Sequence, residues 1–135
     1  MSASTPTILL VEDNDDDVFA MQRALRKAQI AHRVEVVPDG QRAIEYLSGT
    51  GTYADRQSCP IPALMFLDLK LPYVSGFEVL EWLRAHPAHR DLAVVILTGS
   101  GEQSDRDRAA QLGARTYLVK PPEPVELIRL IQQLR

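Results

Sequence analysis

Five side chains capable of chemistry follow the ends of four short apolar runs in this sequence. In chain order they are Glu12 and Asp13, Asp68, Thr98, and Lys120. Continuous apolar runs of this length are typical of strands buried on both faces of a parallel sheet. Open α/β sheets bind their ligands at the carboxyl ends of such strands. We therefore expect three carboxylates, a hydroxyl and an amine to meet at one edge of one sheet.

This combination of groups suits a metal ion and a phosphoryl group. Neighbouring carboxylates repel one another unless a proton or a cation neutralises them, and hard oxygen ligands with open positions favour magnesium. An aspartate such as Asp68 can attack a phosphoryl group to give an acyl phosphate. Lys120 would supply a compact cation and Thr98 a hydroxyl for the phosphoryl oxygens. The set fits phosphoryl transfer to Asp68 by positioning and charge neutralisation.

The segments that must position these groups alternate between strand-like and helical patterns. Strands are expected at 7–11, 33–37, 63–67, 92–97 and 115–119, and helices at 15–29, 39–48, 75–86, 101–112 and 123–134. This alternation predicts an α/β fold with a parallel sheet covered by helices on both faces. Asn14 or Asp15 can cap the first helix, and Gly113 can end the fourth. Residues 48–62 lack an apolar period and are expected to form a long surface loop.

Length and composition indicate one domain of a globular protein. The 135 residues suit a single core, which we expect at 7–135 after a flexible N-terminus at 1–6. A net charge of −3 argues against a nucleic-acid partner, and no apolar run is long enough to span a membrane. The N-terminus does not resemble a signal peptide, and Cys59 is the only cysteine. We therefore expect a cytoplasmic protein without an intrachain disulfide.

Five motifs resemble those of response-regulator receiver domains and occur in the family's order. They are Leu10-Val11-Glu12-Asp13-Asn14, Phe66-Leu67-Asp68-Leu69-Lys70-Leu71-Pro72, Ser75-Gly76-Phe77-Glu78, Leu97-Thr98-Gly99 and Tyr117-Leu118-Val119-Lys120-Pro121. The resemblance implies a flavodoxin-like, doubly wound α/β fold with a five-stranded parallel sheet and five helices. It also implies a single-domain regulator of a two-component phosphorelay that signals through a conformational switch and partner binding.

The resemblance assigns a role to each residue of the expected site. Asp68 would accept a phosphoryl group from a sensor histidine kinase. Asp13, Asp68 and the carbonyl of Lys70 would bind Mg²⁺ directly, and Glu12 would act through water. Lys120 would bind the phosphoryl group and form a cis peptide bond with the proline that follows it.

Two further residues match the family's switch positions, and two features depart from the commoner pattern. Thr98 and Tyr117 match the paired switch residues. Glu12 stands where aspartate is commoner, and the loop at 48–62 is longer than in minimal receivers. The loop and the motif around Glu12 resemble the small stand-alone regulators that partner bacterial phytochromes, which implies a phytochrome-type kinase as a possible partner.

The last predicted helix carries a wider apolar stripe than one buried face requires. Its apolar residues are Val125, Leu127, Ile128, Leu130, Ile131 and Leu134, which span more than half of the circumference. A deeply packed terminal helix and a surface for a homodimer both fit this pattern. Val125 and Ile128 lie farthest from the stripe that packs best on the sheet, so they are the candidates for an outer contact.

Two other functions compete with a phosphorylated signalling module. A magnesium-dependent phosphohydrolase would use the same nucleophile, but such enzymes usually carry a second acid two residues after it, where this chain has Lys70. A module that binds partners without phosphorylation would not need the complete set of acidic, hydroxyl and amine groups. We therefore expect a phosphoacceptor protein with slow autodephosphorylation rather than a dedicated enzyme.

Overall fold

Strands and helices alternate along the chain in a computed structural model, which describes residues 6–99 and 102–133. The strands are β1 (Thr7–Val11), β2 (Arg33–Val37), β3 (Leu64–Leu67), β4 (Ala93–Thr98) and β5 (Thr116–Val119). The α-helices are α1 (Asp15–Lys27), α2 (Gly40–Ser48), α3 (Gly76–Arg84), α4 (Gln103–Gln111) and α5 (Pro124–Gln133). Two short 3₁₀ helices are η1 (Gly51–Tyr53) and η2 (Pro87–His89).

Every observed strand begins and ends within one residue of the position expected from the sequence. The expected helix bounds at 101 and 134 lie outside the described residues.

The strands form one parallel sheet in the order β2-β1-β3-β4-β5. From β1 the chain moves outward to β2 and then crosses to β3 on the other side of β1. The strand order therefore reverses between β1 and β3, which is where open α/β sheets form a ligand-binding crevice. Val11 pairs with Leu67 in this register. The residues that follow these two strands consequently emerge side by side.

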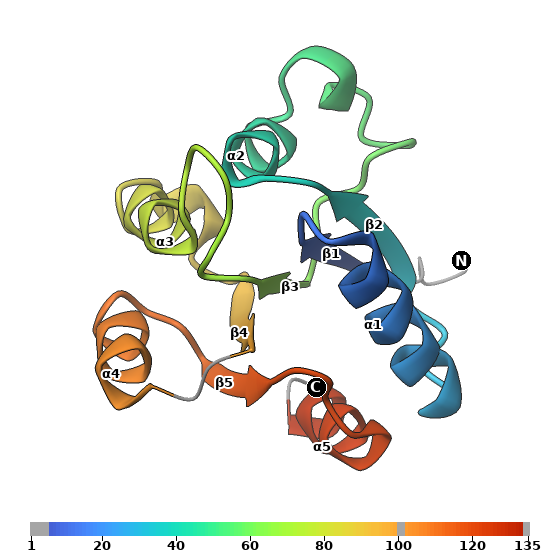
Figure 1. Cartoon of the computed structure of the whole chain (residues 1–135). Coiled ribbons are helices and arrows are strands. Elements are labelled where there is room, and N and C mark those ends of the chain that lie inside the picture. Colours follow the sequence, from blue (N-terminus) through green and yellow to red (C-terminus); the bar gives the residue numbers. More distant parts are fainter. Residues whose placement is uncertain (1–5, 100–101, 134–135) are drawn as a thin grey trace.

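Apolar side chains fill both faces of the sheet. Figure 1 shows α1 and α5 on one face and α2, α3 and α4 on the other. Successive strand residues alternate between the faces, so that Ile8 and Leu10 pack with α1 and α5, whereas Leu9 and Val11 pack toward α2 and α3. The central strands are buried along their whole length, as the continuous apolar runs predicted.

Local capping interactions fix where the helices begin. The Asn14 side chain accepts a hydrogen bond from the Asp17 amide at the start of α1. Ser75 and Glu78 form a capping box at the start of α3. Helix α1 ends two residues earlier than expected, and Gln29 just beyond it has a left-handed φ of 59°. Gly113 follows α4 with a φ of 103°, as expected for a residue that ends a helix.

The loop between α2 and β3 is anchored to the domain rather than irregular throughout. It contains η1, and the Arg56 guanidinium donates hydrogen bonds to the carbonyls of Tyr46, Leu47 and Cys59 at 2.9, 2.9 and 3.2 Å. The Tyr46 hydroxyl donates to the Pro60 carbonyl at 2.8 Å. Arg56 thereby adds donors at the end of α2, where the last carbonyls have no partner further along the helix and the Tyr46 carbonyl otherwise accepts only from the Gly49 amide. The expected surface loop is present, but its shape depends on this arginine.

Candidate phosphoacceptor and metal site

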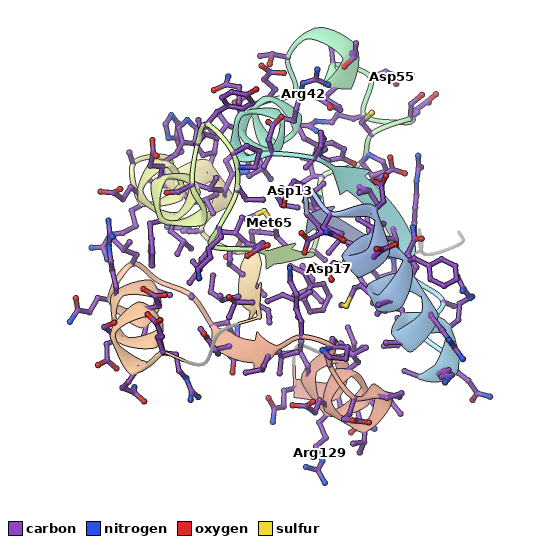
Figure 2. The ribbon with its side chains drawn as sticks, in the orientation of Figure 1. Asp13, Asp17, Arg42, Asp55, Met65 and Arg129 are labelled. Carbon is purple, nitrogen blue, oxygen red and sulfur yellow. The ribbon has the colours of Figure 1, made fainter. Side chains whose placement is uncertain are left out.

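The three carboxylates expected from the sequence converge where β1 and β3 end. Glu12, Asp13 and Asp68 each offer an oxygen atom, and these atoms lie within 4.8 Å of one another. Glu12 and Asp68 are only 3% and 6% exposed, whereas Asp13 is exposed. Figure 2 labels Asp13 at the junction of β1 and α1. Two buried carboxylates and one that solvent can reach therefore share a single crevice.

The loop after β3 packs tightly against Asp68. The Lys70 amide donates a hydrogen bond to Asp68 Oδ1 at 3.1 Å, and the Lys70 side chain is exposed. The Gly76 amide donates to the Leu69 carbonyl at 3.1 Å. A Cβ atom on Gly76 would lie 2.4 Å from the Asp68 carbonyl oxygen, so only glycine permits this approach. The Lys70 amide thus orients the Asp68 carboxylate, and Gly76 packs against the main chain beside it. The Lys70 carbonyl as a metal ligand stays a prediction.

The Lys120 amine lies at the centre of the acidic side chains. Lys120 Nζ lies 2.9 Å from Asp68 Oδ2 and also forms an ion pair with Glu12 Oε1. The Lys120 amide donates to the Thr98 carbonyl at 2.7 Å, which fixes the end of β5 beside the end of β4. The Lys120–Pro121 peptide bond is cis, as the resemblance implied. The structure therefore brings Lys120 together with Glu12 and Asp68 as predicted.

Asp17 is a member of this cluster that sequence reasoning missed. Its Oδ2 lies 2.9 Å from Lys120 Nζ, and it belongs to the first turn of α1. Figure 2 shows Asp17 pointing from α1 toward the centre of the molecule. Three consecutive aspartates begin this helix, and all three interact favourably with the helix dipole. The sequence therefore gives no reason to assign the third a different role. Only its place next to a lysine 103 positions away distinguishes it.

Burial and charge shift the pKa values of two groups in the site. Burial, together with the nearby Asp68 charge, raises the pKa of Glu12 from 4.5 to about 7, although Lys120 acts in the opposite direction. For Lys120, burial disfavours the ammonium form, but its hydrogen bonds with Glu12, Asp17 and Asp68 outweigh burial and raise its pKa above the ordinary value. Lys120 is therefore positively charged at neutral pH, and its single charge does not neutralise all of the carboxylates around it.

These residues fit a divalent cation. Carboxylate oxygens are hard ligands of the kind that Mg²⁺ and Mn²⁺ prefer. Asp13 is exposed, which gives an ion and its waters access to the crevice. A bound cation would also favour the ionised form of Glu12, whose pKa is raised by burial and by the charge of Asp68. The donor set contains oxygen ligands only, since the three histidines lie outside it.

Thr98 and Tyr117 lie on neighbouring strands beside the acidic cluster. Thr98 ends β4 and is 2% exposed, while Tyr117 lies on β5 and pairs with Ile96. Burial, and next the charge of Asp105, raises the pKa of Tyr117, whereas a hydrogen bond with Thr98 lowers it. The Arg106 guanidinium lies 4.8 Å from the centre of the Tyr117 ring. The two residues are close enough to move together, but their role as a switch stays a prediction.

Two histidines, the tryptophan and the cysteine lie away from the acidic cluster. The imidazoles of His86 and His89 lie against the Trp82 ring, with centroids 4.0 and 5.5 Å from it. Cys59 belongs to the loop between α2 and β3 and is a free thiol. Trp82 also packs against the core on the face of the sheet covered by α2 and α3.

Comparison with known proteins identifies the family. A model of the response regulator receiver domain matches residues 8–132. The chain belongs to this family. It is a receiver-domain response regulator of two-component signalling, and its sheet order is that of the flavodoxin-like fold, as expected.

The most similar receivers include regulators associated with phytochromes. Response regulator Rcp1 of Synechocystis sp. is 34% identical over 93% of this chain and 83% of its own length. The crystal structure of its Mn²⁺-bound form matches with a TM-score of 0.77 and 32% identity, covering 96% of this chain and 91% of that one. The bacteriophytochrome response regulator AtBRR matches with a TM-score of 0.84 and 41% identity over 98% and 94% of the two chains. The phosphorylated cyanobacterial phytochrome response regulator RcpA matches with a TM-score of 0.80 and 32% identity over 97% and 91%.

Proposed function

We propose that this receiver accepts a phosphoryl group from a sensor histidine kinase on Asp68, with Mg²⁺ bound beside it. The observation that carries this proposal is the environment of Asp68. Lys120 Nζ lies 2.9 Å from one of its oxygens, and oxygens of Glu12 and Asp13 lie within 4.8 Å. Asp68 thus combines a nucleophilic oxygen, a fixed cation and a place for a second cation.

The transfer itself is a displacement at phosphorus. A carboxylate oxygen of Asp68 attacks the phosphorus of a phosphorylated histidine, and the P–O bond forms as the P–N bond breaks. The electron pair stays on the imidazole nitrogen, which takes up a proton. Lys120 neutralises charge on the transferred oxygens, and the Thr98 hydroxyl binds one of them. Positioning and electrostatic stabilisation account for the chemistry, so no additional acid is required.

Magnesium would be held by Asp13, Asp68 and the Lys70 carbonyl, with Glu12 acting through water. When bound, the ion supplies positive charge to the phosphoryl oxygens. The Mn²⁺-bound structure of Rcp1 supports a divalent cation at a site of this kind. The exposed Lys70 side chain occupies the position where a hydrolase of this type needs a second acid. We therefore infer slow autodephosphorylation and no dedicated hydrolase activity.

The kinase partner is proposed to be of the phytochrome type. AtBRR and RcpA are both described as phytochrome response regulators, and both match nearly the whole chain. The proposed site of signalling is the cytoplasm, which the single cysteine supports. In the described part of the chain, no helix is long and apolar enough to cross a membrane. We take the receiver to extend over residues 7–135 and to act without nucleic acid.

The outer face of α5 is proposed to carry a homodimer contact. Leu127, Leu130 and Ile131 are buried against the sheet, as the stripe predicted. Val125 and Ile128 are 52% and 37% exposed. Val119 on the neighbouring edge strand β5 adds a third exposed apolar side chain, and a two-fold axis would bring this patch against its own copy. Leu134, the last residue of the predicted stripe, lies outside the described residues.

Phosphorylation with a small acyl-phosphate donor tests the central proposal. Wild type treated with acetyl phosphate and Mg²⁺ should gain one phosphoryl group, and peptide mapping should assign it to Asp68. Asp68→Asn should gain none. Asp91→Asn changes an exposed aspartate two residues before β4. It serves as the control and should be labelled like wild type. Equal labelling of Asp68→Asn would overturn the assignment.

A further inference from the structure

Three carboxylates surround the Lys120 ammonium, which donates hydrogen bonds to Asp17 and Asp68 and forms an ion pair with Glu12. An ammonium group carries three N–H donors. Nζ contacts Glu12, Asp17 and Asp68, the latter two at 2.9 Å. Before phosphorylation, therefore, an additional acceptor must compete with three carboxylates for the Lys120 ammonium.

Asp17 differs from the other two partners in where it lies. Glu12 and Asp68 follow strands of the sheet, and their side chains are 2% and 9% exposed, whereas the Asp17 side chain on α1 is 41% exposed. Asp17 and Lys120 also line a pocket of about 320 Å³ whose wall includes Ala20, Met21 and Pro122. Water can reach Asp17 through this side, so Asp17 can exchange Lys120 for solvent at little cost in free energy.

Phosphorylation of Asp68 would redistribute these donors. A phosphoryl group brings three strong acceptor oxygens and additional negative charge to the place that Lys120 already contacts. Glu12 is buried, so its carboxylate cannot replace the contact with Lys120 by contacts with bulk water, and breaking this ion pair costs much free energy. The donor directed at Asp68 passes to the phosphoryl group that Asp68 then carries. Of the other two contacts, the one with Asp17 is therefore released at least cost.

We propose that Asp17 is a positioning residue that competes with the phosphoryl group for the Lys120 ammonium. In the unphosphorylated protein it draws the amine toward α1, and phosphorylation displaces it. Asp17 thereby limits the affinity of the site for a phosphoryl group. Without Asp17 the amine is still held by Glu12 and Asp68, so its position at the site is retained and only the competitor is lost. This inference rests on the proposed function of Asp68.

The test compares two aspartates of the same helical turn. Asp17→Ala and Asp16→Ala remove the same charge from the start of α1, but only Asp17 contacts Lys120. Isothermal titration with beryllofluoride at saturating Mg²⁺ measures the affinity for a phosphoryl mimic. We expect Asp17→Ala to bind about three- to five-fold more tightly than wild type, the upper part of the range for an exposed ion pair, and Asp16→Ala to stay within about 1.5-fold. Asp17→Glu, which keeps an acceptor on α1, should return the affinity toward that of wild type.

A second measurement follows the lysine directly. The ¹⁵N resonance of Lys120 Nζ should shift in Asp17→Ala without the mimic and should coincide with that of wild type once the mimic is bound. Equal gains in affinity for Asp17→Ala and Asp16→Ala would reduce the effect to overall charge and overturn the inference. Weaker binding by Asp17→Ala would overturn it too, since Asp17 would then support the site. Failure of wild type to bind the mimic would instead refute the proposed function, on which the inference rests.

Discussion

Replacing Glu12 by glutamine should make the stability of the magnesium-free protein less dependent on pH. Burial is the main reason why the pKa of Glu12 rises from 4.5 to about 7, and the charge of Asp68 adds to it. A carboxyl whose pKa is raised on folding binds its proton more tightly in the folded state. It therefore contributes stability that is fully present below pH 4.5 and is lost as the pH rises through about 7.

The size of this effect follows from the shift. A change of one pKa unit corresponds to 1.36 kcal/mol, so raising the pKa from 4.5 to about 7 gives at most about 3 kcal/mol. Glutamine keeps the shape and the hydrogen-bonding oxygen but does not titrate. The difference in unfolding free energy between Glu12→Gln and wild type should therefore grow by up to about 3 kcal/mol between pH 4.5 and pH 7.5.

Urea denaturation at a series of pH values, in the presence of a chelator, measures this difference. Glu81→Gln on the exposed face of α3 controls for the removal of one carboxylate. Saturating Mg²⁺ should reduce the loss of wild-type stability near pH 7, because a divalent cation favours the ionised carboxylates. A difference between Glu12→Gln and wild type that stays constant from pH 4.5 to 7.5 would refute the reasoning, since Glu12 would then ionise as readily in the folded protein as in the unfolded chain.

Three further changes have definite expected outcomes. Asp13→Ala should abolish Mg²⁺ binding and phosphorylation by acetyl phosphate, while relief of carboxylate repulsion raises its melting temperature without metal by a few degrees; undiminished labelling in excess chelator would contradict this. Thr98→Ala should accept a phosphoryl group but leave the Tyr117 ring resonances unchanged by a phosphate mimic, whereas those of wild type should move. Changing Val125 and Ile128 to aspartate should weaken self-association in sedimentation experiments without unfolding the domain, and a wild type that stays monomeric at high concentration with and without the mimic would exclude the dimer.

The strands were predictable because local pattern and tertiary environment agree there. A run such as Ala93 to Leu97 is apolar on both faces, and the structure buries it on both faces. The meeting of Glu12, Asp13 and Asp68 followed from a rule of topology, since the carboxyl ends of neighbouring parallel strands share one edge. The bounds of the strands and the cluster of carboxylates could thus both be predicted from the sequence.

What the sequence could not reveal depends on distances between segments far apart in the chain. Asp15, Asp16 and Asp17 are equivalent as residues at the start of a helix, and only the position of Lys120 separates the third from the others. The loop before β3 presented turn residues and no period, so nothing indicated that Arg56 would bind the end of α2. The exposed fractions of Val125 and Ile128 depend in the same way on how far α5 rotates against the sheet.

The way in which Arg56 holds the loop bears on how this family can diverge. The hydrogen bonds of its guanidinium go to the main-chain carbonyls of Tyr46, Leu47 and Cys59. Backbone carbonyls are the same whichever amino acids carry them, so the exposed positions of the loop can change during evolution without loss of these hydrogen bonds. Arg56 itself has no such freedom, because lysine offers a single nitrogen where two guanidinium nitrogens reach three carbonyls. Among homologues with a loop of this length, we expect one invariant arginine among variable exposed loop positions.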